Sequence, residues 1–307
     1  MSTARLTFPL VPRGRVVGLS FGTLRSLHRG AGTDIAGTRP YIPGDDMDAI
    51  DWGASARLST ARGTDEFIVR ERFAEEAPKV MIICDRRPEM AHFAPPLPWL
   101  DKPGAMQSAI ELILASSGAA AGYVGYLDFA DGAAHWRPPK GERKLIEIRD
   151  ERLMSPEYGG PADWLERSFA HLAEYPRAIT AGTFLFLLSD FLVPPSEDLW
   201  LQAFEHRWDV VPVIIQDPVW EQSFPDVPGI VMPLRDARTG RMAPVRLRRK
   251  EAEARRAANE ERLDRFLAQL RDLDIDPVLV SSADPADVLA SFLEWTDMRR
   301  VRRMIRA

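Results

Sequence analysis

Short unbroken runs of apolar residues recur along the chain, and they predict strands that are buried on both faces of a sheet. The clearest run is Val80–Cys84, in which three of the five residues are β-branched. Comparable runs predict further strands at Tyr123–Phe129, Thr183–Leu188, Val210–Ile215 and Pro277–Val280. Asp85 directly follows the first run, so we expect it at the carboxyl end of a strand, where open α/β sheets hold their ligands.

Segments with apolar residues at helical spacing separate these strands. They predict helices at Ala105–Ser117, after Gly159-Gly160-Pro161, at Glu197–Arg207, at Arg248–Leu273 and from Asp284-Pro285 onward. Strands that alternate with helices indicate a mostly parallel sheet with helices on both faces. The sequence therefore predicts an α/β fold with a doubly wound sheet over residues 78–307.

Residues 1–77 contain many glycines and prolines and no sustained helical period. Short apolar pieces alternate there with turn signals, which is typical of loops and short strands. We therefore expect an N-terminal, loop-rich β appendage that ends before Pro78. Smaller elements are also expected: a strand at Ala134–Arg137 after the turn Asp131-Gly132, a hairpin of Ile230–Pro233 with Val245–Leu247, and a short helix at Lys144–Leu153.

Composition narrows the class of protein. The 307 residues are 45% hydrophobic, enough for a large core, and the net charge of −5 argues against a general nucleic-acid binder. The single cysteine, Cys84, excludes an internal disulfide and fits a reducing compartment. No signal-peptide pattern opens the chain, and the apolar stretch Leu112–Leu127 is shorter than the ~20 residues that a membrane span needs. We expect a cytoplasmic protein without a transmembrane segment.

Motifs of several enzyme classes are missing from the sequence. The five histidines form no zinc-binding pattern, and there is no G-x-S-x-G, no Walker-type phosphate loop and no G-x-G-x-x-G after a strand. This favours a protein without catalytic activity.

One block of the sequence is more specific than any of these patterns. From Ser26 the chain reads S-L-H-R-G-A-G-T-D-I-A-G-T-R-P-Y-I-P-G-D-D-M-D-A-I-D-W-G-A-S-A-R. The block resembles the conserved block of a widespread bacterial family, domain-of-unknown-function family fifty-eight. The positions that carry the resemblance are His28, Gly30, Gly32, Arg39, Tyr41, Gly44, Asp45, Asp46, Ile50, Asp51, Trp52, Ser55, Ala56 and Arg57, with Arg70 in a further match.

The resemblance implies a fold and a partner. Members of this family place the block before a von Willebrand factor A-like domain and are commonly associated with MoxR-type AAA ATPases. It therefore implies a non-enzymatic adaptor that works with such an ATPase in protein remodelling or complex maturation. The expected contact surface is the carboxyl edge of the sheet, near Asp85, Arg87, Glu89 and Asp190.

The resemblance also suggests a metal site that has been lost. von Willebrand A-like domains often bind a divalent cation through D-x-S-x-S after the first strand, with an aspartate from a later loop. Here Asp85 and Asp190 match, but Arg87 and Glu89 replace the two serines. We hypothesise that the Arg87 guanidinium pairs with Asp85 or Asp190 in place of the metal, so that no cofactor is bound. The alternative is a Mg²⁺ ion held by Asp85, Glu89 and Asp190.

A cluster of aspartates within Gly44–Trp52 leaves two further alternatives open. In one, the chain is a metal-dependent hydrolase that uses Asp45, Asp46, Asp48 or Asp51 together with Asp85. In the other, it is a structural scaffold without an ATPase partner. The structural interpretation of the cluster is a turn and a short helical turn capped by an aspartate, with carboxylates paired to arginines and Trp52 as a core anchor. The candidate arginines are Arg39, Arg57 and Arg70.

The C-terminal segment Met298–Arg306 is basic and amphipathic. It predicts either a weak contact with a membrane surface or an acidic partner groove, or the solvated end of a core helix. In the second case the arginines of its last turn suit the helix dipole.

Overall fold

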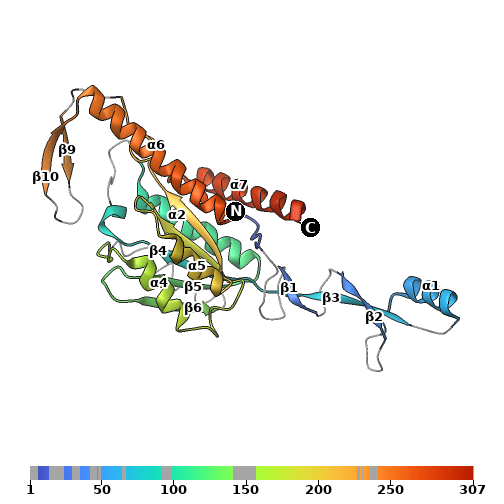
Figure 1. Ribbon diagram of the computed structural model, residues 1–307. Coiled ribbons are helices and arrows are strands. Elements are labelled where there is room, and N and C mark those ends of the chain that lie inside the picture. The colour runs from blue at the N-terminus through green and yellow to red at the C-terminus, as the bar shows by residue number, and fades with distance from the viewer. Residues whose placement is uncertain are drawn as a thin grey trace, which may run out of the picture.

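The computed structural model describes residues 6–13, 24–29, 35–41, 47, 50–63, 67–91, 99–140, 157–226, 229, 231–235, 239 and 241–306. Its centre is a six-stranded sheet in the order β11-β8-β7-β4-β5-β6 (Figure 1). The strands are β4 (Lys79–Cys84), β5 (Tyr123–Asp128), β6 (His135–Lys140), β7 (Phe184–Ser189), β8 (Asp209–Ile215) and β11 (Val278–Val280). All neighbouring pairs are parallel except β5 with β6.

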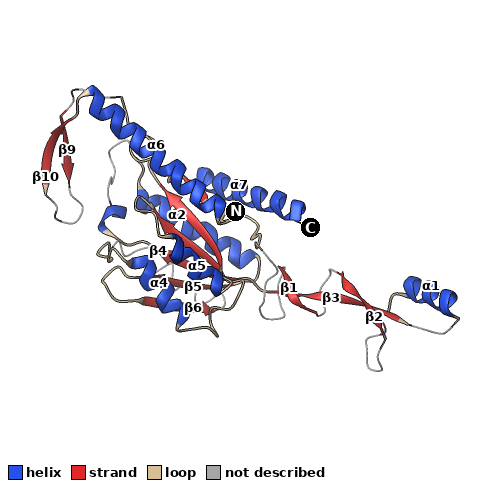
Figure 2. Cartoon of the chain, viewed as in Figure 1, coloured by secondary structure: helices blue, strands red, loops and turns tan. Residues whose placement is uncertain are grey.

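Helices cover both faces of this sheet (Figure 2). One face packs against α2 (Lys102–Ala119) and α7 (Pro285–Arg306). The other packs against α4 (Trp164–Ala173), α5 (Glu197–Glu205) and α6 (Arg249–Asp272). The predicted α/β fold with a doubly wound, mostly parallel sheet is confirmed, and the arrangement is consistent with a von Willebrand A-like domain.

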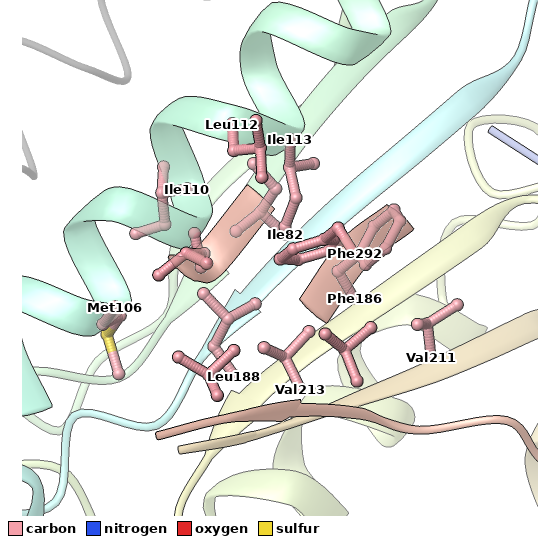
Figure 3. Packing of buried hydrophobic residues seen from close by; sticks show 14 of the residues in the cluster. Ile82, Met106, Ile110, Leu112, Ile113, Phe186, Leu188, Val211, Val213 and Phe292 are labelled. Carbon is pink, nitrogen blue, oxygen red and sulfur yellow. The ribbon is translucent and has the colours of Figure 1, made fainter. Parts of the chain in front are cut away.

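The two covered faces explain the unbroken apolar runs. Successive side chains of a strand point to opposite faces, so a strand between two helical layers needs an apolar residue at every position. In β4, Ile82 lies in the core under α2 and α7, whereas its neighbour Ile83 lies in the core on the other face. Figure 3 shows the first of these cores, in which Ile82 and Phe186 of the sheet meet Ile113 and Phe292 of the helices.

Helix α2 begins earlier than predicted, at Lys102 rather than Ala105. The side chain of Asp101 caps the helix by accepting a hydrogen bond from the Gly104 amide at 3.1 Å. Pro103 lies in the first turn, where the missing amide proton of proline costs no helical hydrogen bond. Pro103 therefore marks the start of the helix.

The smaller elements are mostly as expected. β6 follows the turn after Asp131-Gly132, and β9 (Val231–Arg235) pairs with β10 (Met242–Arg246) in an antiparallel hairpin. The helix expected at Lys144–Leu153 lies outside the described residues.

The N-terminal region forms an arm that extends away from the α/β domain (Figure 1). Its antiparallel sheet has the order β1-β3-β2, and α1 lies at the far end. The elements are β1 (Leu24–Arg29), β2 (Ile35–Pro40), α1 (Trp52–Arg62) and β3 (Ile68–Glu76). The expectation of strands is met, but α1 extends well beyond the single helical turn that the sequence suggested. A largely exposed helix needs no apolar stripe, so the pattern gave no signal for it.

The described start of the chain packs on the α/β domain rather than on the arm. Phe8 is buried, and its ring stacks on that of Phe292 with a centroid separation of 4.5 Å. The Phe8 amide donates a hydrogen bond to the Ser116 hydroxyl at 2.9 Å. Residues 6–13 thus complete the core beneath α2 and α7, although the predicted division placed them with the appendage.

This packing predicts a large cost for truncating Phe8. Replacement by alanine should lower the free energy of unfolding by about 3–5 kcal/mol, because it leaves a cavity between α2, α7 and the sheet. Leu6→Ala is the matched control, since Leu6 is exposed, and it should change the stability by less than about 0.5 kcal/mol. Urea unfolding of both variants measures the difference. Equal stability losses would show that residues 6–13 do not belong to the core.

Candidate functional site

Asp85 and Asp190 lie side by side at the carboxyl edge of the sheet. Asp85 follows β4 and Asp190 follows β7, and the two strands are neighbours. The Asp85 amide continues their pairing by donating to the Leu188 carbonyl at 2.9 Å. β5 lies on one side of β4 and β7 on the other, so the order of the strands reverses at β4. Such a reversal is where doubly wound sheets bind their ligands.

Arg87 fills the space between the two carboxylates. Its Nε lies 3.0 Å from both Asp85 oxygens, and its Nη2 lies 2.6 Å from Asp85 Oδ2. The same Nη2 donates to Asp190 Oδ1 at 3.1 Å. The hypothesis that Arg87 pairs with Asp85 or Asp190 is confirmed, and the guanidinium binds both.

A second internal cation, which sequence reasoning missed, completes the network. Lys102, the first residue of α2, is buried, and its Nζ lies 3.0 Å from Asp190 Oδ2. It also forms an ion pair with Glu221, which follows β8. The sequence held one signal: a cation at a helix N-terminus is disfavoured by the helix dipole unless carboxylates surround it.

Burial and pairing act against each other in this ion network, which consists of Asp85, Arg87, Lys102, Asp190 and Glu221. Burial raises the pKa of Asp85, while the hydrogen bond and charge of Arg87 pull it down. Burial likewise raises the pKa of Glu221 against the charge of Lys102. Burial opposes the charge of Lys102, yet the carboxylates of Asp190 and Glu221 leave its pKa above the usual value. Burial outweighs the pairing at Asp85 and Glu221, whose pKa values stay above the usual ones, whereas the pairing outweighs burial at Lys102.

The network also occupies the oxygens that a metal ion would need. Both Asp85 oxygens accept hydrogen bonds from Arg87, and Oδ2 accepts a further one from the Ser189 hydroxyl at 2.7 Å. The Asp190 oxygens accept from Arg87 and from Lys102. Within the described part of the chain, no three histidine, cysteine, aspartate or glutamate residues form a group able to hold a metal ion. A cation at Asp85 and Asp190 would have to displace both internal cations.

Glu89, the remaining candidate ligand, lies in the 3-10 turn η2 (Pro88–Ala91) and is only partly buried. Burial lowers the pKa of Arg87, but Asp85, Asp190 and, to the smallest extent, the charge of Glu89 raise it above its usual value. The structure does not assemble it with Asp85 and Asp190 into a shared ligand set.

A separate buried network lies beside the first one. The guanidinium of Arg86 donates to the Tyr126 hydroxyl at 3.0 Å, and that hydroxyl donates to Asp128 at 2.8 Å. Arg86 also lies over the ring of Tyr158.

Burial raises the pKa of Cys84, at the end of β4, to about 12. The thiol is therefore protonated at neutral pH and does not provide a nucleophile.

The aspartate cluster and the ion network lie in different parts of the fold. Asp51 is in the arm, where its side chain caps α1 by accepting from the Ala54 amide at 3.0 Å. Asp85 is in the α/β domain, so the structure does not bring these two residues together. Other members of the cluster and their predicted partners lie outside the described residues or side chains: His28, Arg39, Gly44, Asp45, Asp46, Asp48 and Arg70.

The prediction that Trp52 anchors a core is wrong. Its side chain is 59% exposed, and it meets the ring of Phe67 edge to face at 5.9 Å. Tyr41 contacts the same ring. Arg57, which was expected to pair with an aspartate, donates from its Nε to the Gly53 carbonyl at 3.1 Å. The described residues around α1 leave the Trp52 ring largely exposed.

Arginines of the C-terminal segment pair α7 with carboxylates at the amino edge of the sheet, opposite the ion network. Arg299 is buried, and its Nη2 lies 2.8 Å from Oδ1 of Asp209, which opens β8. Arg302 pairs with Asp276 at 2.8 Å. These contacts favour the interpretation as the end of a core helix, while the contact with a membrane surface stays a prediction. No helix in the described part of the chain has the length and apolarity to cross a membrane.

Comparisons with known proteins found a matching family, uncharacterised relatives and a solved structure. The sequence model of the family described as "Protein of unknown function DUF58" matches residues 37–265. Uncharacterised proteins of Mycobacterium tuberculosis and Mycobacterium bovis are 24% identical over 240 residues, which is 78% of this chain and 72% of theirs. An aerotolerance-related membrane protein from Bacteroides fragilis aligns with a TM-score of 0.36 and 18% identity, over 64% of this chain and 97% of that one.

The ion network predicts a strong effect of removing Arg87. Arg87→Met should lower the free energy of unfolding by about 3–5 kcal/mol, because two buried carboxylates lose their shared guanidinium. The matched control is Arg167→Met, which breaks an exposed pair with Asp163 at 2.8 Å and should cost about 0.5 kcal/mol or less. Denaturant unfolding at neutral pH compares them. Similar small losses in both variants would mean that pairing of Asp85 and Asp190 with Arg87 contributes little to the free energy of unfolding.

Proposed function

The chain belongs to the family described as "Protein of unknown function DUF58", and on that premise we propose that it is a non-enzymatic adaptor for a MoxR-type AAA ATPase in protein remodelling or complex maturation. The support for the partner is the family resemblance of the block between His28 and Arg57. The support for an adaptor rather than an enzyme is the ion network.

The network lies where a doubly wound sheet would otherwise bind a substrate or cofactor. Arg87 and Lys102 neutralise Asp85 and Asp190 from within the protein. With internal cations in place of a ligand, the rim of this edge can serve for contacts with another protein. This is the observation on which the proposed function depends most.

The rim around the network carries the features of a protein contact surface. Val193 follows β7 and is 74% exposed, and Val219 follows β8 and is also exposed. Glu89 lies beyond β4 at the same edge, since the carboxyl ends of parallel strands meet there. Two exposed apolar residues and a charged residue at one edge of the sheet provide side chains that another protein could cover. We therefore place the ATPase contact on Glu89, Val193 and Val219.

A titration with Mg²⁺ or Mn²⁺ tests the proposal that the site at Asp85 and Asp190 binds no metal ion. The wild-type protein should give no binding heat in the micromolar range, because Arg87 and Lys102 already satisfy the carboxylates. Calorimetry makes the measurement, with Asp85→Ala as the matched variant. Micromolar binding by the wild type that vanishes in Asp85→Ala would overturn the proposal of a metal-free site.

Affinity purification from the native host tests the partner. The wild-type chain should recover an AAA ATPase, and Val193→Asp combined with Val219→Asp should weaken that recovery at least about tenfold, as should Glu89→Arg. The control variants are Leu201→Asp and Glu174→Arg, which alter exposed residues away from this rim and should leave recovery unchanged. Recovery of no ATPase, or equal recovery by all variants, would contradict the adaptor role.

A further inference from the structure

The β9–β10 hairpin projects beyond the start of α6, away from the sheet (Figure 1). Most of β10 is exposed, and the exposed residues include Met242, at 62%, and Val231 on the neighbouring strand. A two-stranded hairpin in water is marginally stable by itself. Exposed apolar side chains on such an element indicate a surface that another molecule covers.

The edges of the hairpin are poorly suited to adding a further strand. Pro233 lies directly opposite Pro244 in the antiparallel register. Proline has no amide proton, so both strands lack a donor at the same level of the hairpin. Prolines at this position block the pairing of an exposed edge with another chain. The hairpin should therefore contact a partner through side chains on its faces.

The charge of this segment is opposite to that of the rest of the chain. Residues 229–250 contain seven basic residues and one acidic residue, a net charge of +6 in a chain of net charge −5. Neither Arg241 nor Arg246 has a carboxylate partner among the residues that the structure describes. The segment contains no aromatic residue. Elements that bind membrane surfaces usually carry aromatic residues, whereas methionine and arginine are enriched at protein interfaces.

The far end of the arm has the complementary properties. Met47 is 67% exposed, and Trp52 and Phe67 are exposed beside each other. By sequence, residues 41–67 contain six acidic and two basic residues, a net charge of −4. An apolar surface in an acidic stretch of the sequence suits an apolar element that carries arginines, because guanidinium groups bind carboxylates with two parallel hydrogen bonds.

We infer that the β9–β10 hairpin of one copy docks on the arm tip, defined by Met47, Trp52 and Phe67, of a second copy. Figure 1 shows the hairpin and α1 at opposite ends of the molecule, so one chain does not join its own two surfaces. The contact is head to tail, and each bound pair keeps one free hairpin and one free arm tip. Repetition of such a contact produces a ring or an open chain of subunits. This assembly is independent of the proposed ATPase contact.

Sedimentation of the full chain over a dilution series tests the assembly. The wild type should form dimers and larger species as its concentration rises. The association should weaken in high salt, because the Debye length falls from about 10 Å at 0.1 M to about 3 Å at 1 M. Arg241→Glu combined with Arg246→Glu should shift the midpoint of association at least about tenfold to higher concentration. Met47→Lys combined with Trp52→Lys should do the same, and all four residues are exposed.

A mixture of the two double variants provides the decisive measurement. Each variant keeps one intact surface, so the hairpin of the arm variant should bind the arm tip of the hairpin variant. The mixture should form one-to-one heterodimers and nothing larger. Val193→Asp, placed at the proposed ATPase contact, is the control and should assemble like the wild type. A wild type that stays monomeric, variants that still assemble, or a mixture that forms no heterodimer would each overturn the inference.

Discussion

The binding of one guanidinium between two buried carboxylates is the interaction on which the rest of the α/β domain depends. Asp85 and Asp190 end neighbouring strands, so their like charges are forced together by the sheet itself. Two buried carboxylates that lie so close together can stay ionised only if cations pair with them. Arg87 supplies the first cation from the adjoining loop, and Lys102 supplies the second from the start of α2. The network thereby joins β4, β7, α2 and, through Glu221, the segment after β8.

A second set of buried charges holds the opposite edge of the sheet. Arg299 of α7 pairs with Asp209 at the beginning of β8 and donates to the Val11 carbonyl at 3.0 Å. The two ends of the described chain are therefore fixed to the same edge, with Phe8 packed on α7 between them. In the described part of the α/β domain, ion networks therefore lie at both edges of the sheet and helices cover both of its faces.

Two further exposed features lie away from the six-stranded sheet and the helices that cover it. The arm presents Trp52 and Phe67 at its far end, and the hairpin presents Met242 on the other side of the molecule. In both regions the residues that the structure describes leave these side chains exposed. The proposed role in protein contacts is compatible with the ion network at the sheet edge and with the exposed side chains of the arm and the hairpin.

The sequence by itself predicted the sheet and three residues of the ion network, Asp85, Arg87 and Asp190. Unbroken apolar runs predict buried strands because both faces are covered, and Arg87 is close to Asp85 along the chain, so their pairing follows from local geometry. Asp190 joined them because neighbouring parallel strands end at one edge. Lys102 and Glu221 were decided only by the tertiary structure, since they are distant from each other in sequence and meet through the packing of α2. The same holds for Trp52, because hydrophobicity predicts burial only where a fold provides a core to receive the ring.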